Sequence, residues 1–260
     1  MFLALFAITQ ITRIRTHALE NQRRRLEEAV AARSAELQAA NKRLEEASLK
    51  DPLTGISNRR FFEVTIPRDV QQTIRAYQAA SPHEPPRDRD LVFFIMDIDH
   101  FKNLNDTWGH AAGDEVLVAM ASRLASVIRE ADMLVRWGGE EFLIVSQSTS
   151  ADAAQHVARR ILEVIGGQPF ETSDGLSISK TCSVGWAAFP WISKTPVDVS
   201  VDDILKLADR ALYMAKQGGR NRAIGLYPDE SMEDEPIDQQ KARPRAIEIH
   251  GPVPSVEYQS

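Results

Sequence analysis

Residues 91–96 form an uninterrupted apolar run, Leu-Val-Phe-Phe-Ile-Met, with charged residues on either side. A run this short and this uniformly apolar is typical of a β-strand that is buried on both faces. Such a strand needs neighbouring strands at its edges and other elements packed above and below it. The run therefore predicts a covered sheet, that is, an α/β sandwich.

The surrounding region, residues 51–227, carries both helix-like and strand-like patterns. Apolar residues at helical spacing predict helices at about 59–80, 116–128, 152–165 and from 204 to just before Gly218. Short apolar runs predict strands at 133–135, 142–145 and near residues 178 and 184. Gly138 and Gly139 separate two of these runs, which indicates a hairpin. We expect one domain, a central and mostly antiparallel sheet flanked by helices.

The first 18 residues begin with an apolar run, residues 1–8, and continue with arginines. This order resembles a membrane helix where it enters the cytoplasm. Eight residues cannot cross a bilayer about 30 Å thick, so we interpret residues 1–18 as a membrane-proximal stub. The alternative is the frayed start of an amphipathic helix.

Residues 19–50 contain no Gly or Pro and consist mainly of strong helix formers. Apolar residues recur every seven positions, and Arg33 interrupts them once. The members of this seam are Leu19, Leu26, Val30, Leu37, Ala40, Leu44 and Ala47. The spacing predicts a coiled coil that dimerises the chain, with a single solvated helix as the alternative. Asp51-Pro52 ends the pattern, because proline disfavours helical geometry in the residue before it.

Charge and composition limit the remaining possibilities. The net charge of −6 argues against binding to a nucleic-acid backbone. Residues 228–260 hold several prolines and an excess of acidic residues, and we expect this tail to be disordered. Cys182 is the single cysteine, which excludes an intrachain disulfide and fits a reducing compartment. The cysteine and the scattered histidines have no zinc-ligand spacing.

Acidic residues follow the central apolar strand and fill the predicted hairpin. Asp97 and Asp99 stand at the end of the strand, and we expect their side chains on opposite faces. Glu140 and Glu141 follow the two glycines, whose backbone can approach a ligand closely. If the strands are neighbours, Asp97 and Glu140 converge and repel each other unless a cation lies between them. Mg²⁺, held by carboxylates and phosphate oxygens, is the natural partner; a solvated acidic turn is the alternative.

Several cationic and polar residues could complete a nucleotide site around these acids. Lys216 and Arg220 near the end of the last helix could clamp a polyphosphate, or simply complement the helix dipole. Lys102 could neutralise charge on a phosphoryl group. Asn105 and Asp114 could hydrogen-bond a base edge, and an Asp suits the adjacent donors of guanine. Taken alone, both residues would be helix caps. His110 is the weakest candidate.

At this point several ordered motifs carry a resemblance to the diguanylate cyclase (GGDEF) domain family, over about residues 48–227. Those motifs are Asp51-Pro52-Leu53-Thr54-Gly55, Asn58-Arg59-Arg60, the run 97–106, Gly109-His110, Gly113-Asp114-Glu115, Arg136-Trp137-Gly138-Gly139-Glu140-Glu141-Phe142, Ala215-Lys216 and Gly219-Arg220-Asn221. The signature turn has Glu140 where the family name has Asp, which keeps the carboxylate.

The resemblance implies a palm-like fold related to class III nucleotide cyclases, and the condensation of two GTP into cyclic di-GMP and pyrophosphate. It implies that Asp97, the Ile98 carbonyl and Glu140 hold Mg²⁺ or Mn²⁺, with Glu140 also acting as the base. By the same resemblance Asn105 and Asp114 read guanine beside His110. The remaining substrate contacts that it implies are Phe101, Lys102, Gly138, Gly139, Lys216 and Arg220, with Lys102 stabilising the transition state.

The spacing of Arg129 and Asp132 before the glycine pair resembles the family's product-inhibition site, to which Arg160 could add a second arginine. Taken alone, Arg129 and Asp132 would be a surface ion pair worth about 0–1 kcal/mol. The resemblance further implies a bacterial, cytoplasmic enzyme, attached to a membrane if a further upstream segment exists, that works as a homodimer. Two alternatives remain: an inactive domain that serves as a cyclic di-GMP receptor, and a coiled-coil adaptor with an inert domain.

Overall fold

The structure, a computed structural model, describes residues 49–80, 89–193, 195–229 and 236–253, together with scattered positions between residues 13 and 37. The chain divides into two units, Met1–Ser48 and Leu49–Ser260.

In the first unit the described positions are helical. Leu26, Val30 and Leu37 are exposed there, and the described ion pairs join side chains of one helix, such as Arg23 with Glu27. The other seam positions and almost all of the expected stub at 1–18 lie outside the described residues, so the coiled coil and the stub remain predictions. Among the positions that the structure does describe, no helix is both long and apolar enough to span a membrane.

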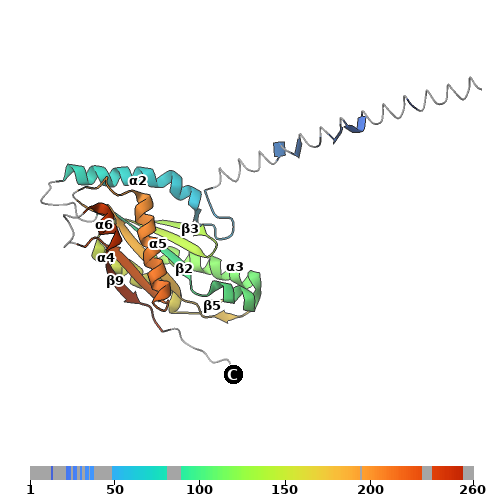
Figure 1. Ribbon diagram of the computed structural model, residues 1–260. Helices are drawn as coiled ribbons and strands as arrows, with labels where there is room; N and C mark the ends of the chain where they lie inside the picture. The colour runs from blue at the N-terminus through green and yellow to red at the C-terminus, as the bar shows by residue number, and fades with distance from the viewer. Residues whose placement is uncertain are drawn as a thin grey trace, which may run out of the picture. The chain divides into compact units, whose positions relative to one another are not determined.

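The second unit is built on a seven-stranded sheet with the order β1-β3-β4-β2-β7-β8-β9. Figure 1 labels β2, β3 and β9 of this sheet. The pairs β1–β3 and β7–β8 are parallel, and the other neighbours are antiparallel. The main-sheet strands are β1 (Ser57–Asn58), β2 (Asp90–Ile98), β3 (Met133–Gly138), β4 (Glu141–Thr149), β7 (Cys182–Phe189), β8 (Arg222–Tyr227) and β9 (Arg245–His250). A small separate sheet pairs β5 (Phe170–Glu171) with β6 (Ser177–Ile178).

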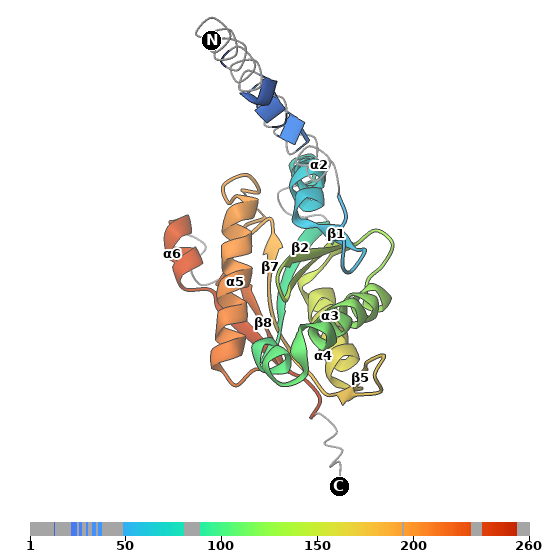
Figure 2. The same ribbon diagram turned by 90° about the vertical axis from the view of Figure 1, so that its right-hand side faces the viewer.

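Helices cover both faces of the large sheet (Figure 2). They are α2 (Arg59–Ala79), α3 (Phe101–Val127), α4 (Ala151–Gly166), α5 (Val201–Gln217) and the short α6 (Ile237–Ala242). Side-chain oxygens of Asn58, Ser150 and Ser200 cap the N-termini of α2, α4 and α5, which satisfies backbone donors that have no partner within the helix. The fold class expected from the sequence, a mostly antiparallel sheet flanked by helices, is confirmed.

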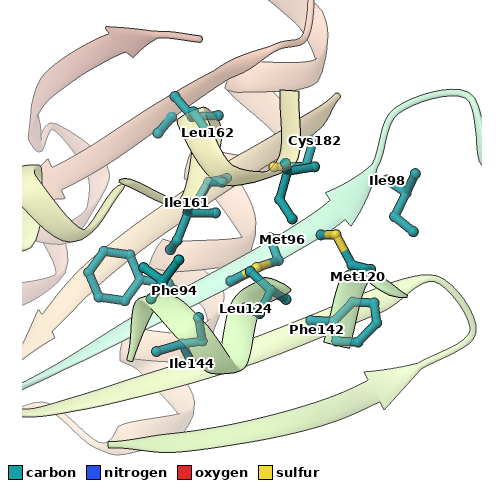
Figure 3. Packing of buried hydrophobic residues seen from close by; sticks show 14 of the residues in the cluster. Phe94, Met96, Ile98, Met120, Leu124, Phe142, Ile144, Ile161, Leu162 and Cys182 are labelled. Carbon is teal, nitrogen blue, oxygen red and sulfur yellow. The ribbon is translucent and has the colours of Figure 1, made fainter. Parts of the chain in front are cut away.

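The central strand β2 explains why the sheet has two apolar layers. Phe94, Met96 and Ile98 point to one side, where they pack with residues of α3 and α4 (Figure 3). Phe93 and Ile95 point to the other side and pack with residues of α2 and α5. Successive side chains of a strand alternate between faces, so a strand that is apolar at every position serves both layers. This places the end of β2, and Asp97 with it, between the helical layers.

The tail is the main departure from the expected domain organisation. Residues 228–260 are predicted from composition to be disordered, but they contain α6 and β9, and β9 pairs with β8 along its whole length. Ile249 joins one core cluster and Ile247 packs against it. The average composition hides this local alternation of apolar and polar residues, and the open edge of β8 supplies the backbone hydrogen bonds that the segment needs.

Candidate functional site

Strand register brings the acidic residues of β2 and the β3–β4 hairpin together. In the β2–β4 pair, Asp97 lies opposite Glu141, so both side chains share a face of the sheet. Glu140 precedes Glu141 in the turn, after Gly138 and Gly139, and Gly139 has φ 54°. A positive φ costs glycine nothing, so the tight turn can present Glu140 beside the end of β2.

The electrostatic state of these carboxylates shows that they influence one another. Burial, followed by the repulsion of Asp97, raises the pKa of Glu140 above its ordinary value. The same two causes raise the pKa of Glu141. Burial also raises the pKa of Asp97; there the bond to Lys216 opposes the shift, and the charge of Asp99 adds to it. The site therefore concentrates negative charge in a partly desolvated position.

Two cations at the end of α5 reach this acidic group. The Lys216 ammonium lies 2.9 Å from Asp97 Oδ2. The charge of Arg220, in the turn after α5, also lowers the pKa of Asp97. The pKa of Asp97 nevertheless remains raised, so Lys216 and Arg220 compensate the acids only in part. The alternative from the sequence, in which both cations complement the helix dipole, does not include the ion pair of Lys216 with Asp97 of β2.

The expectation that Asp97 and Asp99 diverge to opposite faces is wrong. Ser183 of β7 lies opposite Asp97 in the sheet, and its hydroxyl donates to Asp99 Oδ1 at 2.7 Å. Residues two apart along a strand share a face, and this is what the structure has. Asp99 is buried at 4% exposure, and it accepts further hydrogen bonds from Thr181 Oγ1 and from the backbone N–H of Asn221. Asp99 thus connects the end of β2 with β7 and with the turn after α5.

The candidate base-reading residues lie within α3, so neither is a cap of that helix. Gly109 interrupts the helix with φ 82°, which separates the part that carries Asn105 from the part that carries Asp114. Asn105 lies over Gly113, where an added Cβ would stand 2.0 Å from Asn105 Oδ1. Asn105 Oδ1 is buried and has no hydrogen-bond partner. A buried acceptor without a partner is costly, so this oxygen is suited to receive a donor from a ligand.

The other α3 candidates differ in exposure. Phe101, the first residue of the helix, is buried and contacts the same space above Gly113. Lys102, His110 and Asp114 are exposed. An exposed cation and an exposed carboxylate on one helix can contact a bound molecule without a desolvation cost to the fold.

The donor set at this site fits a hard divalent cation. Mg²⁺ and Mn²⁺ prefer oxygen ligands. Either ion would relieve the repulsion between closely spaced carboxylates whose pKa values are raised. Within residues 49–253, as far as the structure describes them, no three His, Cys, Asp or Glu side chains form a metal cluster. The remaining ligands of such an ion would have to be backbone carbonyls, water or phosphate oxygens.

The second candidate site is a turn at the end of α3. Asp132 accepts from the backbone N–H groups of Arg129 at 2.9 Å and Gln147 at 3.1 Å. Ser146 Oγ also donates to Asp132, so the carboxylate orders this turn. Arg160 is exposed on α4, and the hydrogen bonds and ion pairs of the described residues do not connect it with Arg129 or Asp132.

One contact near the hairpin has no counterpart in the sequence predictions. Arg136 of β3 donates through Nη1 to Asp51 Oδ1 at 3.0 Å and through Nη2 to the Gly139 carbonyl at 2.9 Å. It thereby joins the turn before β1 to the turn that carries Glu140. Asp51 and Arg136 both stand in motifs noted from the sequence, but 85 residues separate them, and no periodic signal pairs them.

Comparisons with known proteins show which family the chain resembles. The family model described as "Diguanylate cyclase, GGDEF domain" matches residues 48–222. The diguanylate cyclase DgcP of Pseudomonas aeruginosa is 36% identical over 175 residues, which are 67% of this chain and 23% of that protein. The response regulator PleD of Caulobacter vibrioides is 36% identical over 181 residues, or 69% of this chain and 36% of PleD. The chain thus spans well under half the length of these curated relatives.

Solved structures show the same likeness. The coiled coil and GGDEF domain of DgcB from Caulobacter crescentus, in complex with c-di-GMP, aligns with a TM-score of 0.57 and 27% identity, covering 77% of this chain and 98% of that one. The diguanylate cyclase SiaD from Pseudomonas aeruginosa, in complex with its activator SiaC, aligns with a TM-score of 0.55 and 30% identity, covering 84% of this chain and 80% of that one.

Proposed function

The chain belongs to the diguanylate cyclase GGDEF domain family, and on that premise we propose that it condenses two molecules of GTP into cyclic di-GMP. In this reaction the 3′-hydroxyl of each GTP attacks the α-phosphate of the other. Two phosphodiester bonds form, and two molecules of pyrophosphate leave. The observation that carries the proposal is the grouping of Asp97, Glu140 and Lys216 at the end of β2, because phosphoryl transfer needs positioning and charge neutralisation more than covalent chemistry.

Asp97, Glu140 and the Ile98 carbonyl would hold the divalent ion, Mg²⁺ or Mn²⁺. A bound ion there supplies charge neutralisation to the phosphates of GTP. The raised pKa values of Asp97 and Glu140 support this assignment, since a cation between the two carboxylates would remove their mutual repulsion.

Glu140 is the proposed general base for the 3′-hydroxyl. A base works best when its pKa lies near the working pH, and burial together with Asp97 moves the pKa of Glu140 in that direction. Lys216 and Arg220 would bind the terminal phosphates that leave as pyrophosphate. Lys102 would stabilise charge on the reacting phosphoryl group from the first turn of α3, next to Phe101.

Asn105 and Asp114 would recognise guanine, whose edge offers adjacent N–H donors. The buried Oδ1 of Asn105 without a partner supports this role, and Gly113 leaves room for it. His110 would lie beside the base, and the backbone of Gly138 and Gly139 would approach the nucleotide. A base that offers an acceptor in place of a donor would leave the Asn105 oxygen unsatisfied, which is a basis for selecting guanine.

Each site would hold one GTP, so synthesis requires two domains face to face. We assign the dimerisation to residues 19–50, because a coiled coil raises the effective concentration of one domain at the other. Replacing Leu37 by Lys should therefore lower the specific activity chiefly at low protein concentration. A dilution series compared with wild type tests this; equal activities across the series would contradict the assignment.

Arg129 and Asp132, with Arg160, are the proposed site for inhibition by the product. The ordered turn around Asp132 supports a preformed site, and a related GGDEF domain was solved in complex with c-di-GMP. We place the domain in the bacterial cytoplasm, where GTP is available.

The decisive experiment is incubation of the purified chain with GTP and Mg²⁺, followed by measurement of pyrophosphate and cyclic di-GMP. Formation of one cyclic di-GMP for every two pyrophosphates supports the proposal. Binding of cyclic di-GMP without turnover would instead assign the chain as a receptor. Absence of both would leave an adaptor with an inert domain.

A further inference from the structure

The turn after α5 has a backbone that the residues around it must hold in place. Gly219, Arg220 and Asn221 have φ angles of 115°, 63° and 47°. Positive φ is free for glycine but sterically costly for residues with a side chain, and Asn tolerates it better than Arg. Such a conformation persists where neighbouring contacts determine it. Arg220 is the proposed phosphate ligand, so these contacts bear on substrate binding.

One set of contacts ties the turn to β2. The backbone N–H of Asn221 donates to Asp99 Oδ2 at 2.9 Å. Asp99 is itself fixed by the hydroxyls of Thr181 at 2.6 Å and Ser183 at 2.7 Å. Asp99 follows Asp97 by two residues. This network therefore holds the turn that carries Arg220 next to the end of β2, which would bind the metal.

A second set of contacts comes from β9 and the two residues that follow it. Gly251 N–H donates to the Asn221 carbonyl at 2.8 Å, and Asn221 Nδ2 donates to the Pro252 carbonyl at 2.7 Å. A Cβ on Gly251 would stand 2.1 Å from Asn221 Oδ1, so the fit is close. Arg222 adds a further link, since its Nε donates to the Arg220 carbonyl and its Nη1 pairs with Glu248 of β9.

The segment that makes these contacts, β9 with residues 251–252, lies outside the family domain, whose model ends at residue 222. Contacts with β8 and α5 hold it and the preceding α6 in position. β9 pairs with β8 from Arg245 to His250, and Arg210 of α5 donates to the carbonyls of Lys241 and Ala242 at the end of α6. The segment is thus held at both ends, by α5 through α6 and by the turn through Asn221.

We propose that residues 248–252 are a positioning element of the nucleotide site: they clamp Asn221 against Asp99 and so fix the backbone that presents Arg220 to the substrate phosphates. The proposal rests on the proposed function and adds a part of the chain beyond the family domain to it. Asn221 and Gly251 act through Arg220, so removing the clamp should weaken binding of the triphosphate and spare the chemical step.

The first test is Asn221→Gly in the full chain with Mg²⁺. Glycine keeps the positive φ and removes the bond to the Pro252 carbonyl. We expect the KM for GTP to rise about 5–10-fold, the size of a lost hydrogen bond to an ordered group, with kcat within about twofold. Inhibition by inorganic tripolyphosphate should weaken by the same factor, while inhibition by guanosine, which has no phosphates, should not change.

Three further variants show whether the effect passes through Arg220. Gly251→Ala, whose added Cβ would crowd the Asn221 side chain, should give the same pattern and remains a test if Asn221→Gly does not fold. Arg245→Ala, at the exposed far end of β9, is the matched control and should leave both inhibition constants unchanged. In an Arg220→Ala background, Asn221→Gly should add no further loss of tripolyphosphate affinity, because contacts that act as a unit are not additive.

The outcomes separate the two proposals. A wild-type chain that makes no cyclic di-GMP overturns the proposed function, whatever the variants do. A wild-type chain that is active, with Asn221→Gly and Gly251→Ala that both keep the wild-type KM and tripolyphosphate inhibition, overturns the positioning role alone. Equal weakening of tripolyphosphate and guanosine would also overturn it, since that pattern indicates general damage to the fold.

Discussion

Two acidic regions adjoin the β3–β4 hairpin, and they differ in how far hydrogen-bond donors and cations compensate their negative charge. On one side, Asp51 receives two hydrogen bonds from Thr54 and two from Arg136. Burial alone would raise its pKa, but the bonds from Thr54 and Arg136 outweigh burial and lower it. On the other side, Asp97, Glu140 and Glu141 have raised pKa values, because burial and mutual repulsion exceed the compensation by Lys216.

This difference separates a carboxylate that holds the fold from carboxylates that are available for chemistry. Asp51 is already fully engaged with protein donors, so ionisation there stabilises the native state. The repulsion between Glu140 and Asp97 destabilises the native state, and a bound cation would remove this repulsion. Uncompensated charge in a partly buried position is a mark of a functional site, and the following four tests address that contrast.

The largest expected effect is on turnover in Glu140→Gln. The substitution keeps the shape but removes both a metal ligand and the proposed base, and we expect the rate to fall by at least about 1,000-fold. The melting temperature should not fall, since a repelled charge is lost. Glu63→Gln, in an exposed ion pair on α2, is the matched control. A rate within tenfold of wild type in Glu140→Gln would remove the contrast.

The next effect is on stability in Asp51→Asn. This change removes the charge that pairs with the half-buried guanidinium of Arg136, and we expect a loss of about 1–3 kcal/mol in the free energy of unfolding by urea. Glu63→Gln serves again as the reference and should cost no more than about 1 kcal/mol. If both variants lose the same amount, Asp51 is not a structural carboxylate.

A smaller effect is expected from Mg²⁺ alone. A ligand that binds only the native state adds RT ln(1 + [L]/Kd), about 1.4 kcal/mol at ten times the Kd. Without nucleotide, Mg²⁺ should therefore raise the melting temperature of wild type by about 3–6 °C. Asp97→Asn should lose this gain, and sodium chloride of equal ionic strength should not produce it. The same gain in Asp97→Asn would show that the ion binds elsewhere.

The smallest effect is the pH dependence of stability without metal. Because the pKa values of Asp97, Glu140 and Glu141 are raised, the native state binds protons more readily than the unfolded state. Stability should therefore rise as pH falls toward the ordinary values, 4.5 for the two Glu and 3.8 for Asp97. Asp51 acts in the opposite sense: its contribution is present above 3.8 and is lost below it. Thermal melts from pH 7 to 3 test both signs, and Glu140→Gln should flatten the upper part of the curve.

Much of the fold could be predicted from local patterns. The apolar run of β2 indicated a strand buried on both faces, and the stripes of α2, α4 and α5 indicated helices whose observed bounds differ by a residue or a few. These signals work because burial imposes a period of two on strands and 3.6 on helices. The tail shows where averaging fails, since two isoleucines at alternate positions in β9 outweigh an acidic, proline-rich composition.

The candidate site could be predicted in its members more than in its connections. Asp97 and Glu140 were recognisable because each follows a strand or a glycine turn. The same rule of alternation, wrongly applied to Asp97 and Asp99, misplaced a carboxylate that the structure joins to Ser183. The links of Asp51 with Arg136 and of Asn221 with Pro252 join residues that are 85 and 31 positions apart, and no local pattern encodes such pairs.

By itself the sequence determined the kinds of element, their order and the presence of a nucleotide-cyclase motif set, because these depend on near neighbours along the chain. The tertiary structure alone decided which charges are compensated. Whether a carboxylate is ordered by donors or left facing another carboxylate depends on which strands pair and in which register, and that is a property of distant segments. The same chemical group therefore stabilises the fold at residue 51 and is compensated only in part at residue 140.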